Sequence, residues 1–241
     1  MARRRFFVPE VRRDVAELTG PDAEHLVRVL RAQPGQVYEL SDNHDVYLAE
    51  IETARKSEVT FRIVEKLDLP PASVQIILIA ALIKFDRLEW LIEKATELGV
   101  CAIQPFEAAR SERGLARAAS KRLARWERIA VEASQQSRRA RLPRIEPPVR
   151  FVKALQIDAN IRLLLDESAG AAQPILSCLP AARTSDQKVA LLLGPEGGWT
   201  DEEREEAVAA GWLACSLGAT ILRAETAGIA AIAIIQAAWS S

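Results

Sequence analysis

The sequence of 241 residues predicts an α/β protein in which a small β-rich domain precedes a larger domain built on a parallel sheet. Three observations support this prediction. Short alternating segments dominate residues 1–70, consecutive prolines stand at 70–71, and nearly continuous apolar runs then alternate with helical patterns. We therefore expect two domains, one over residues 1–70 and one over residues 72–241.

Most of the first domain is expected to be strand. Residues 59–64 alternate between apolar and polar side chains, which is typical of a half-buried strand. Residues 19–31 instead predict a helix, because Leu26, Val29 and Leu30 share one helical face. The other strands expected in this domain cover residues 6–8, 37–40 and 46–51.

The second domain is expected to alternate buried strands with helices. Residues 74–82 are apolar almost without interruption, as in a strand that is covered on both faces. Leu88, Leu91 and Ile92 lie at helical spacing and predict a helix over 85–98, which Gly99 would end. A long helix is also predicted over 117–138, and further strands over 100–106, 161–165, 189–193 and 213–217.

The segment 227–239 predicts a helix that is apolar on nearly every side. Such a helix needs burial all round. It is therefore either a central core helix or part of a subunit interface, and the modest length of the chain favours the interface.

The charged residues are unevenly distributed, although the net charge is only -1. Residues 110–150 carry 12 Lys and Arg against 4 Asp and Glu. A basic block of this kind indicates either a polyanion partner or a solvated helix face. The composition as a whole, 49% hydrophobic and 27% charged, is ordinary for a folded protein.

The cysteines and histidines exclude several classes of site. Cys101, Cys178 and Cys215 are far apart and form no CxxC motif, which argues against a disulfide framework and favours the cytoplasm. With only His25 and His44 in the chain, no metal site is expected. We also expect no secretory signal and no membrane span, since no apolar run reaches roughly 20 residues.

The glycine-rich segment 194–198, GPEGG, follows the strand expected over 189–193. Thr200 and Glu203 form a capping-box pattern, and residues 201–203 place three carboxylates in the first helical turn. These carboxylates would repel a phosphate, and no P-loop lysine follows. The loop therefore fits a ligand without phosphate that approaches the backbone closely, or else a tight turn without a ligand.

A second segment, residues 217–227 (LGATILRAETA), follows the strand expected over 213–217. Its Arg223 and Glu225 need partners, because unpaired buried charge is costly, and they could pair with each other. The ends of successive buried strands meet at the edge where open α/β sheets bind ligands. Both segments are therefore expected at one ligand site.

The segments GPEGGWTDEE and LGATILRAETA resemble the signature segments of the RsmE family of SPOUT-class methyltransferases. Residues 24–31, 93–100 and 133–143 resemble the family's HHLxxVLR, KATELGV and EQSxR…LP segments, in the same order along the chain. The resemblance thus extends over nearly the whole sequence. The chain departs from the pattern at Glu24, Phe85 and Gln135.

The resemblance implies a fold and an activity. The expected fold is a PUA-like β-barrel for RNA binding, followed by a SPOUT α/β domain with a C-terminal trefoil knot. The expected activity is methylation of N3 of a uridine in 16S ribosomal RNA of the small subunit, with S-adenosylmethionine as methyl donor. A homodimer is implied as well, with the cofactor bound in the knot loops.

Residue roles follow from the same resemblance. Because uracil N3 must lose a proton before it attacks, Glu225 or Glu196 could act as the base, and Arg223 could stabilise the uracil anion. The residues expected to bind the cofactor are Leu165, Leu193, Gly194, Glu196, Gly197, Gly198, Leu217, Gly218, Leu222 and Thr226.

RNA is expected to be held by arginines, most of them on phosphate. The candidates are Arg3, Arg4, Arg5, Arg28, Arg31, Arg110, Arg113, Arg138, Arg139 and Arg144. Two other functions are compatible with the sequence. One is a different SPOUT activity, such as ribose 2′-O-methylation of tRNA or rRNA, and the other is a non-catalytic RNA-binding assembly factor.

Overall fold

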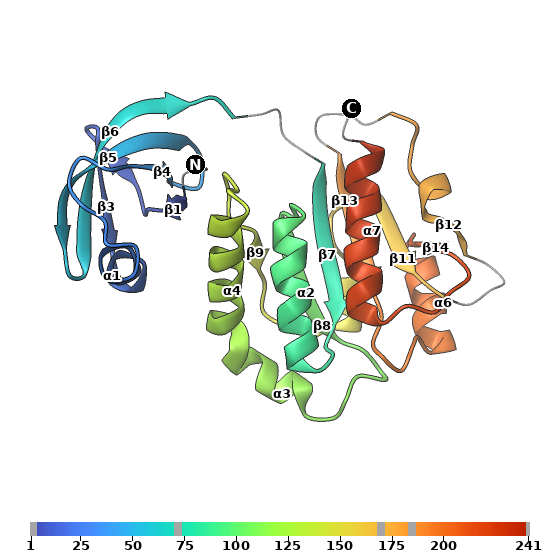
Figure 1. The fold of residues 1–241 in the computed structure, drawn as a ribbon. Helices are drawn as coiled ribbons and strands as arrows, with labels where there is room; N and C mark the ends of the chain where they lie inside the picture. The colour runs from blue at the N-terminus through green and yellow to red at the C-terminus, as the bar shows by residue number, and fades with distance from the viewer. Residues whose placement is uncertain (1–3, 70–73, 168–171, 183–186, 240–241) are drawn as a thin grey trace. The chain divides into compact units, whose positions relative to one another are not determined.

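The computed structural model describes residues 4–69, 74–167, 172–182 and 187–239 (Figure 1). The chain divides into two compact units, one formed by Met1–Pro71 and Val131–Leu142 and the other by Ala72–Ala130 and Pro143–Ser241. Each unit has its own hydrophobic core. The expected linker prolines, Pro70 and Pro71, lie outside the described residues.

The first unit contains a six-stranded sheet in the order β1-β4-β5-β6-β3-β2. All neighbouring strands are antiparallel except β1 and β4. The predicted β-rich domain is thus confirmed, and the short strands β2 and β3 are additional to the prediction. The elements are β1 Arg5–Phe7, β2 Val11–Arg12, β3 Val15–Thr19, α1 Gly20–Arg28, β4 Val37–Ser41, β5 Val46–Arg55 and β6 Glu58–Leu67.

Helix α1 is shorter than the sequence predicts. It ends at Arg28, and Arg31 has a positive φ of 53°. The predicted apolar face is therefore incomplete: Leu26 is buried, but Val29 lies beyond the helix and is exposed. Leu30 still packs against the core of the first unit.

The segment 131–142 belongs to the first unit because its backbone bonds to the strands there. The Ser41 hydroxyl donates to the Ala140 carbonyl at 2.6 Å, and the Leu142 N–H donates to the Asn43 side chain at 2.7 Å. Arg138 contributes its guanidinium to an ion pair with Glu39. These contacts join two parts of the chain that are about a hundred residues apart in sequence.

The second unit is built on an eight-stranded sheet in the order β10-β8-β7-β13-β11-β14-β12, with β9 beside β8. Every strand pair is parallel, which confirms the predicted parallel sheet. The strands are β7 Gln75–Ala81, β8 Ala102–Glu107, β9 Arg144–Ile145, β10 Val149–Arg150, β11 Ile161–Leu165, β12 Gln173–Pro174, β13 Lys188–Leu193 and β14 Leu213–Ser216.

Helices cover both faces of this sheet, which explains the unbroken apolar run of β7. Ile76 and Leu78 pack in one cluster with α2 (Phe85–Glu97) and α7 (Ala224–Ala238). Ile77 and Ile79 pack in a second cluster with α5 (Phe151–Ala154) and α6 (Asp201–Ala209). Helices α2 and α7 lie side by side in front of β7 and β13 in Figure 1.

The long helix predicted over 117–138 is interrupted. It consists of α3 Leu115–Ala119, the 3-10 turn η1 Ser120–Arg122 and α4 Leu123–Gln136. The turn places the Arg122 guanidinium carbon 5.0 Å from the centre of the Phe85 ring, which itself packs edge-on against Trp126. Helix α4 ends before Arg138, whose φ is +56°.

Helix α7 is buried along one side. Gly228 allows close approach there, since a Cβ would lie 3.0 Å from Leu91 and 3.1 Å from Leu193. Ile232 and Ile235 are fully buried in the same core, whereas Ile229 is only partly covered. Across the described segments, no helix meets the length and hydropathy that a membrane span requires.

Candidate functional site

A cavity of about 350 Å³ lies where β11, β13 and β14 end. This is the edge of the sheet at which the sequence places the ligand site, and the volume suits an organic cofactor. Gly197 and Thr226 do not line the cavity. The predicted cofactor residues that do line it are Leu165, Leu193, Gly194, Glu196, Gly198, Leu217, Gly218 and Leu222.

Residues 194–199, here called the first loop, are shaped by Trp199. The Trp199 indole N–H donates to the Leu165 carbonyl at 2.8 Å, which joins the loop to the end of β11. A Cβ at Gly194 would lie 2.8 Å from the indole ring, so only glycine fits there. Gly198, with a φ of +70°, donates its N–H to the Pro195 carbonyl at 2.9 Å.

The capping box at the start of α6 is present as predicted. The Thr200 side chain accepts from the Glu203 N–H at 3.2 Å, and Glu203 accepts from the Thr200 N–H at 3.1 Å. Hydrogen bonds from its own backbone and from Thr200, together with the positive charge of Arg110, hold the pKa of Glu202 below its usual value. A negative charge therefore persists at this helix start, where a phosphate would otherwise bind.

Two ion pairs border the cavity. Arg87, at the start of α2, pairs with Glu196 of the first loop, so this carboxylate has a cation beside it. Arg204 of α6 pairs with Asp166, which follows β11, at 2.8 Å. The Asp166 hydrogen bond raises the pKa of Arg204. Both positive and negative side chains thus line the cavity.

Residues 217–223, here called the second loop, carry the predicted Arg223. Its side chain is exposed and lines the cavity directly before α7 begins. Glu225, in contrast, is only 6% exposed and does not line the cavity, and within the described chain its Oε2 atom has no hydrogen-bond partner. The suggested Arg223–Glu225 contact does not occur in the described structure. Glu196 is therefore the better placed of the two candidate bases.

Several residues that line the cavity are not predicted from the sequence, among them Arg87, Asp166, Trp199 and Arg204. A signal existed for three of them. Asp166 directly follows a predicted buried strand, Trp199 directly follows the predicted GPEGG segment, and Arg87 stands shortly after β7. Arg204 gave no comparable signal, because its partner Asp166 is 38 residues away in sequence.

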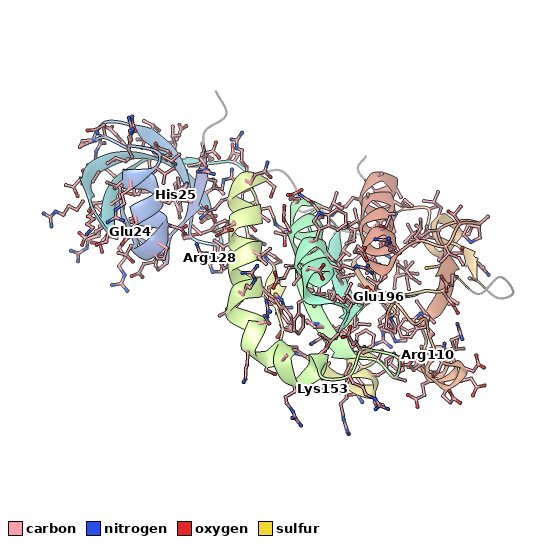
Figure 2. All side chains as sticks on the ribbon, turned by 60° about the horizontal axis from the view of Figure 1, so that its bottom comes forward. Glu24, His25, Arg110, Arg128, Lys153 and Glu196 are labelled. Carbon is pink, nitrogen blue, oxygen red and sulfur yellow. The ribbon has the colours of Figure 1, made fainter. Side chains whose placement is uncertain are left out.

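The candidate RNA-binding arginines differ in availability. Arg5 is only 8% exposed and bonds Glu39 at 2.8 Å, so its side chain is not available to RNA phosphate. Arg110 bonds the backbone of the first loop. Arg3 lies outside the described residues, and Arg31 and Arg113 are exposed. The others have nearby partners: Arg4 with His25, Arg28 with Glu24, Arg138 with Glu39, Arg139 with Arg141 and Arg144 with Glu146. Figure 2 labels His25 and Glu24, which both belong to α1.

The relatives of the chain identify its family. The family model described as an RNA methyltransferase domain matches residues 70–236, and that of an RNA methyltransferase PUA domain matches residues 18–64. Ribosomal RNA small subunit methyltransferase E of Bacillus subtilis is 31% identical over 247 residues, spanning 96% of this chain and 95% of the relative. The chain belongs to this family. The Synechocystis member is 34% identical over 230 residues, spanning 93% of this chain and 73% of its own length.

Solved structures of similar methyltransferases share the fold. The Neisseria gonorrhoeae enzyme bound to S-adenosyl methionine superposes with a TM-score of 0.86 at 31% identity, covering 99% of this chain and 98% of its own. A putative methyltransferase of Legionella pneumophila, also with bound cofactor, gives a TM-score of 0.88 at 29% identity, covering 99% of both chains. The family resemblance drawn from the sequence is confirmed.

Proposed function

We propose that the protein methylates N3 of a uridine in 16S ribosomal RNA of the small ribosomal subunit, with S-adenosylmethionine as donor. The single observation that carries this proposal is the cavity where β11, β13 and β14 end, in a chain that belongs to the methyltransferase E family. The relative from Neisseria gonorrhoeae binds S-adenosyl methionine. Its similarity over nearly the whole chain supports the same cofactor here.

The lining of the cavity fits this cofactor. S-adenosylmethionine has no phosphate, in agreement with the carboxylates at the start of α6, and it supplies an electrophilic methyl group on a sulfonium when bound. Leu193, Gly194 and Leu217 offer backbone and apolar surface to the adenosine. Glu196 and Asp166 offer negative charge to the cationic end of the molecule.

Residues of the chain also suit the acceptor. Uracil N3 carries a proton on the Watson–Crick edge, so the target must be unpaired or flipped out of a helix. Glu196 is the proposed base, and Arg87 and Arg223 are cations on the cavity wall that stabilise the charge left on the ring. Holding donor and acceptor in line contributes further to the rate.

The domains and the assembly are part of the proposal. Residues 1–70, with which residues 131–142 form the first unit, would be the PUA-like RNA-binding domain, and the rest of residues 72–241 would be the SPOUT methyltransferase domain with its trefoil knot. A homodimer would form through the outer side of α7, where Ile229 and Ile234 are only partly covered. The reaction would take place in the cytoplasm, where ribosomal subunits assemble.

The dimer is tested by a charge on the outer side of α7. Ile232 and Ile235 are unsuitable positions, because both are fully buried in the core of the second unit. Ala230 is partly exposed, so Ala230→Glu is expected to give a folded monomer in analytical ultracentrifugation. A dimer of unchanged affinity would contradict this interface.

The activity is tested with small subunits from cells that lack the modification. Purified protein and methyl-labelled S-adenosylmethionine should label 16S RNA, and mass spectrometry should locate the methyl group on the base of a uridine. A methyl group on ribose would favour the other SPOUT activity. Tight binding to the subunit without any transfer would favour the assembly factor.

A further inference from the structure

We propose that Arg110 is a positioning residue for the cofactor, which holds the first loop in its binding shape and does not contact RNA phosphate. This inference rests on the proposed function, because it takes the first loop as part of the S-adenosylmethionine site. Arg110 does not line the cavity. Its effect on the cofactor would therefore be transmitted entirely through the loop backbone.

The Arg110 side chain contacts the first loop in two ways. Its Nη1 atom donates to the Gly197 carbonyl at 3.2 Å and to the Trp199 carbonyl at 3.1 Å. Its aliphatic stem packs on Gly197, where a Cβ would lie only 3.0 Å from the Arg110 Cβ atom. These contacts flank Gly198, a cavity residue with a φ of +70°. Figure 2 labels Arg110, in the turn after β8, and Glu196 of the first loop.

Ala109, the residue before Arg110, bonds the start of α6. The Ala109 N–H donates to the Glu203 carboxylate at 2.8 Å, and this buried carboxylate also completes the capping box with Thr200. The turn itself is closed by Ser111, whose N–H donates to the Ala108 carbonyl at 3.1 Å. The turn after β8 thus supports both the first loop and the start of α6.

The first loop needs this support because it is rich in glycine. A loop with three glycines in six residues loses much conformational entropy when it adopts one shape. A ligand that must order the loop binds more weakly than one that meets it already ordered. Arg110 provides the order in advance, through charge-assisted hydrogen bonds to two loop carbonyls.

The test compares three variants of the intact protein. Arg110→Met keeps an aliphatic stem but loses both hydrogen bonds. Arg110→Lys can restore them in part, because a single nitrogen of Arg110, Nη1, donates in both bonds. Arg117→Met is the matched control, an exposed arginine in the same basic block. Calorimetry measures the affinity for S-adenosylhomocysteine, and filter binding at several salt concentrations measures the affinity for 16S RNA.

We expect Arg110→Met to weaken S-adenosylhomocysteine binding by about ten-fold, as lost charge-assisted hydrogen bonds would. KM for S-adenosylmethionine should rise equally, with kcat at saturation and the affinity for RNA changed less than about two-fold. Arg110→Lys should recover most of the cofactor affinity, and Arg117→Met should keep all of it. Gly197→Ala, which pushes against Arg110 from the other side, should reproduce the selective loss.

The opposite pattern would overturn the inference. In that case Arg110→Met leaves the affinity for S-adenosylhomocysteine unchanged and weakens the affinity for RNA. If the slope of log RNA affinity against log salt concentration then falls by about one, Arg110 contacts phosphate. If Arg110→Met is poorly folded, a normal cofactor affinity of Gly197→Ala would likewise overturn it. Failure of the unaltered protein to bind S-adenosylhomocysteine would instead contradict the proposed function itself.

Discussion

The two loops that border the cavity are held in place very differently. The first loop, residues 194–199, receives hydrogen bonds from Arg110 and bonds the end of β11 through the Trp199 indole. In the second loop, residues 217–223, hydrogen bonds of the described chain join Gly218 to the side chain of Ser216, and the Arg223 carbonyl to the Ala227 N–H at the start of α7. Ile221 at the centre of the second loop is 79% exposed.

This contrast indicates how the site is assembled. The first loop is ordered by the protein alone, so it can receive part of a cofactor without rearrangement. The second loop has few contacts that fix it, and binding would have to order it. Arg223, the proposed cation for the uracil ring, belongs to the second loop. The catalytic contacts would therefore be completed only after the cofactor is bound.

The largest expected effect is on stability, through the residue that shapes the first loop. Trp199 is buried and its ring stacks 6.1 Å from that of Phe106. Trp199→Ala should lower the free energy of unfolding by about 3–5 kcal/mol in urea denaturation. Trp90→Ala is the control, because Trp90 is 46% exposed, and an equal loss in both variants would contradict the role given to Trp199.

A change in the second loop should affect catalysis and leave stability unaltered. Arg223→Ala removes an exposed cation from the cavity wall and should lower kcat by about 10²-fold or more. The free energy of unfolding should stay within about 0.5 kcal/mol of that of the unaltered protein. Single-turnover kinetics and urea denaturation measure the two effects. A normal kcat with weaker cofactor binding would place Arg223 on the cofactor.

A matched pair of threonines compares the start of α6, directly after the first loop, with the second loop. Thr200→Ala removes the capping box after the first loop and should cost about 1 kcal/mol of unfolding free energy. Thr220→Ala, in the exposed part of the second loop, should cost almost nothing. Urea denaturation of both variants provides the measurement. Equal losses would show that the second loop is as firmly held as the start of α6.

The smallest effect concerns Cys215, whose thiol lies in the cavity wall. Burial raises the pKa of the Cys215 thiol from 9.0 to about 12, with a smaller contribution from electrostatic repulsion by Cys178. Because the thiolate is the reactive form, its alkylation by iodoacetamide should be slow at pH 8 and still be rising at pH 10. Mass spectrometry of the labelled peptide follows the rate. A plateau near pH 9 would contradict a raised pKa.

The predictable parts of the structure were those that local sequence determines. The apolar runs at β7 and β13 predicted the buried sheet, and Thr200 with Glu203 predicted the capping box. Both loops were correctly expected at the edge of the sheet, because parallel strands bring their carboxyl ends together.

The parts that could not be predicted depend on distant contacts. The hydrogen bond of Arg110 to the first loop could not be predicted, because Gly197 is 87 residues away in sequence. Glu225 resembled a site residue, yet its place on the inner side of α7 buries it away from the cavity. The predicted long helix is interrupted where Arg122 packs over Phe85, which no local pattern reveals.

Hydrogen exchange with and without S-adenosylhomocysteine tests the contrast between the loops most directly. We predict that the amides of residues 219–223 exchange rapidly in the free protein and become protected when the ligand binds. The amide of Gly198, already bonded to Pro195, should be protected in both states. Equal gains of protection in the two loops, or a gain in the first loop alone, would contradict an ordered first loop and a second loop that binding completes.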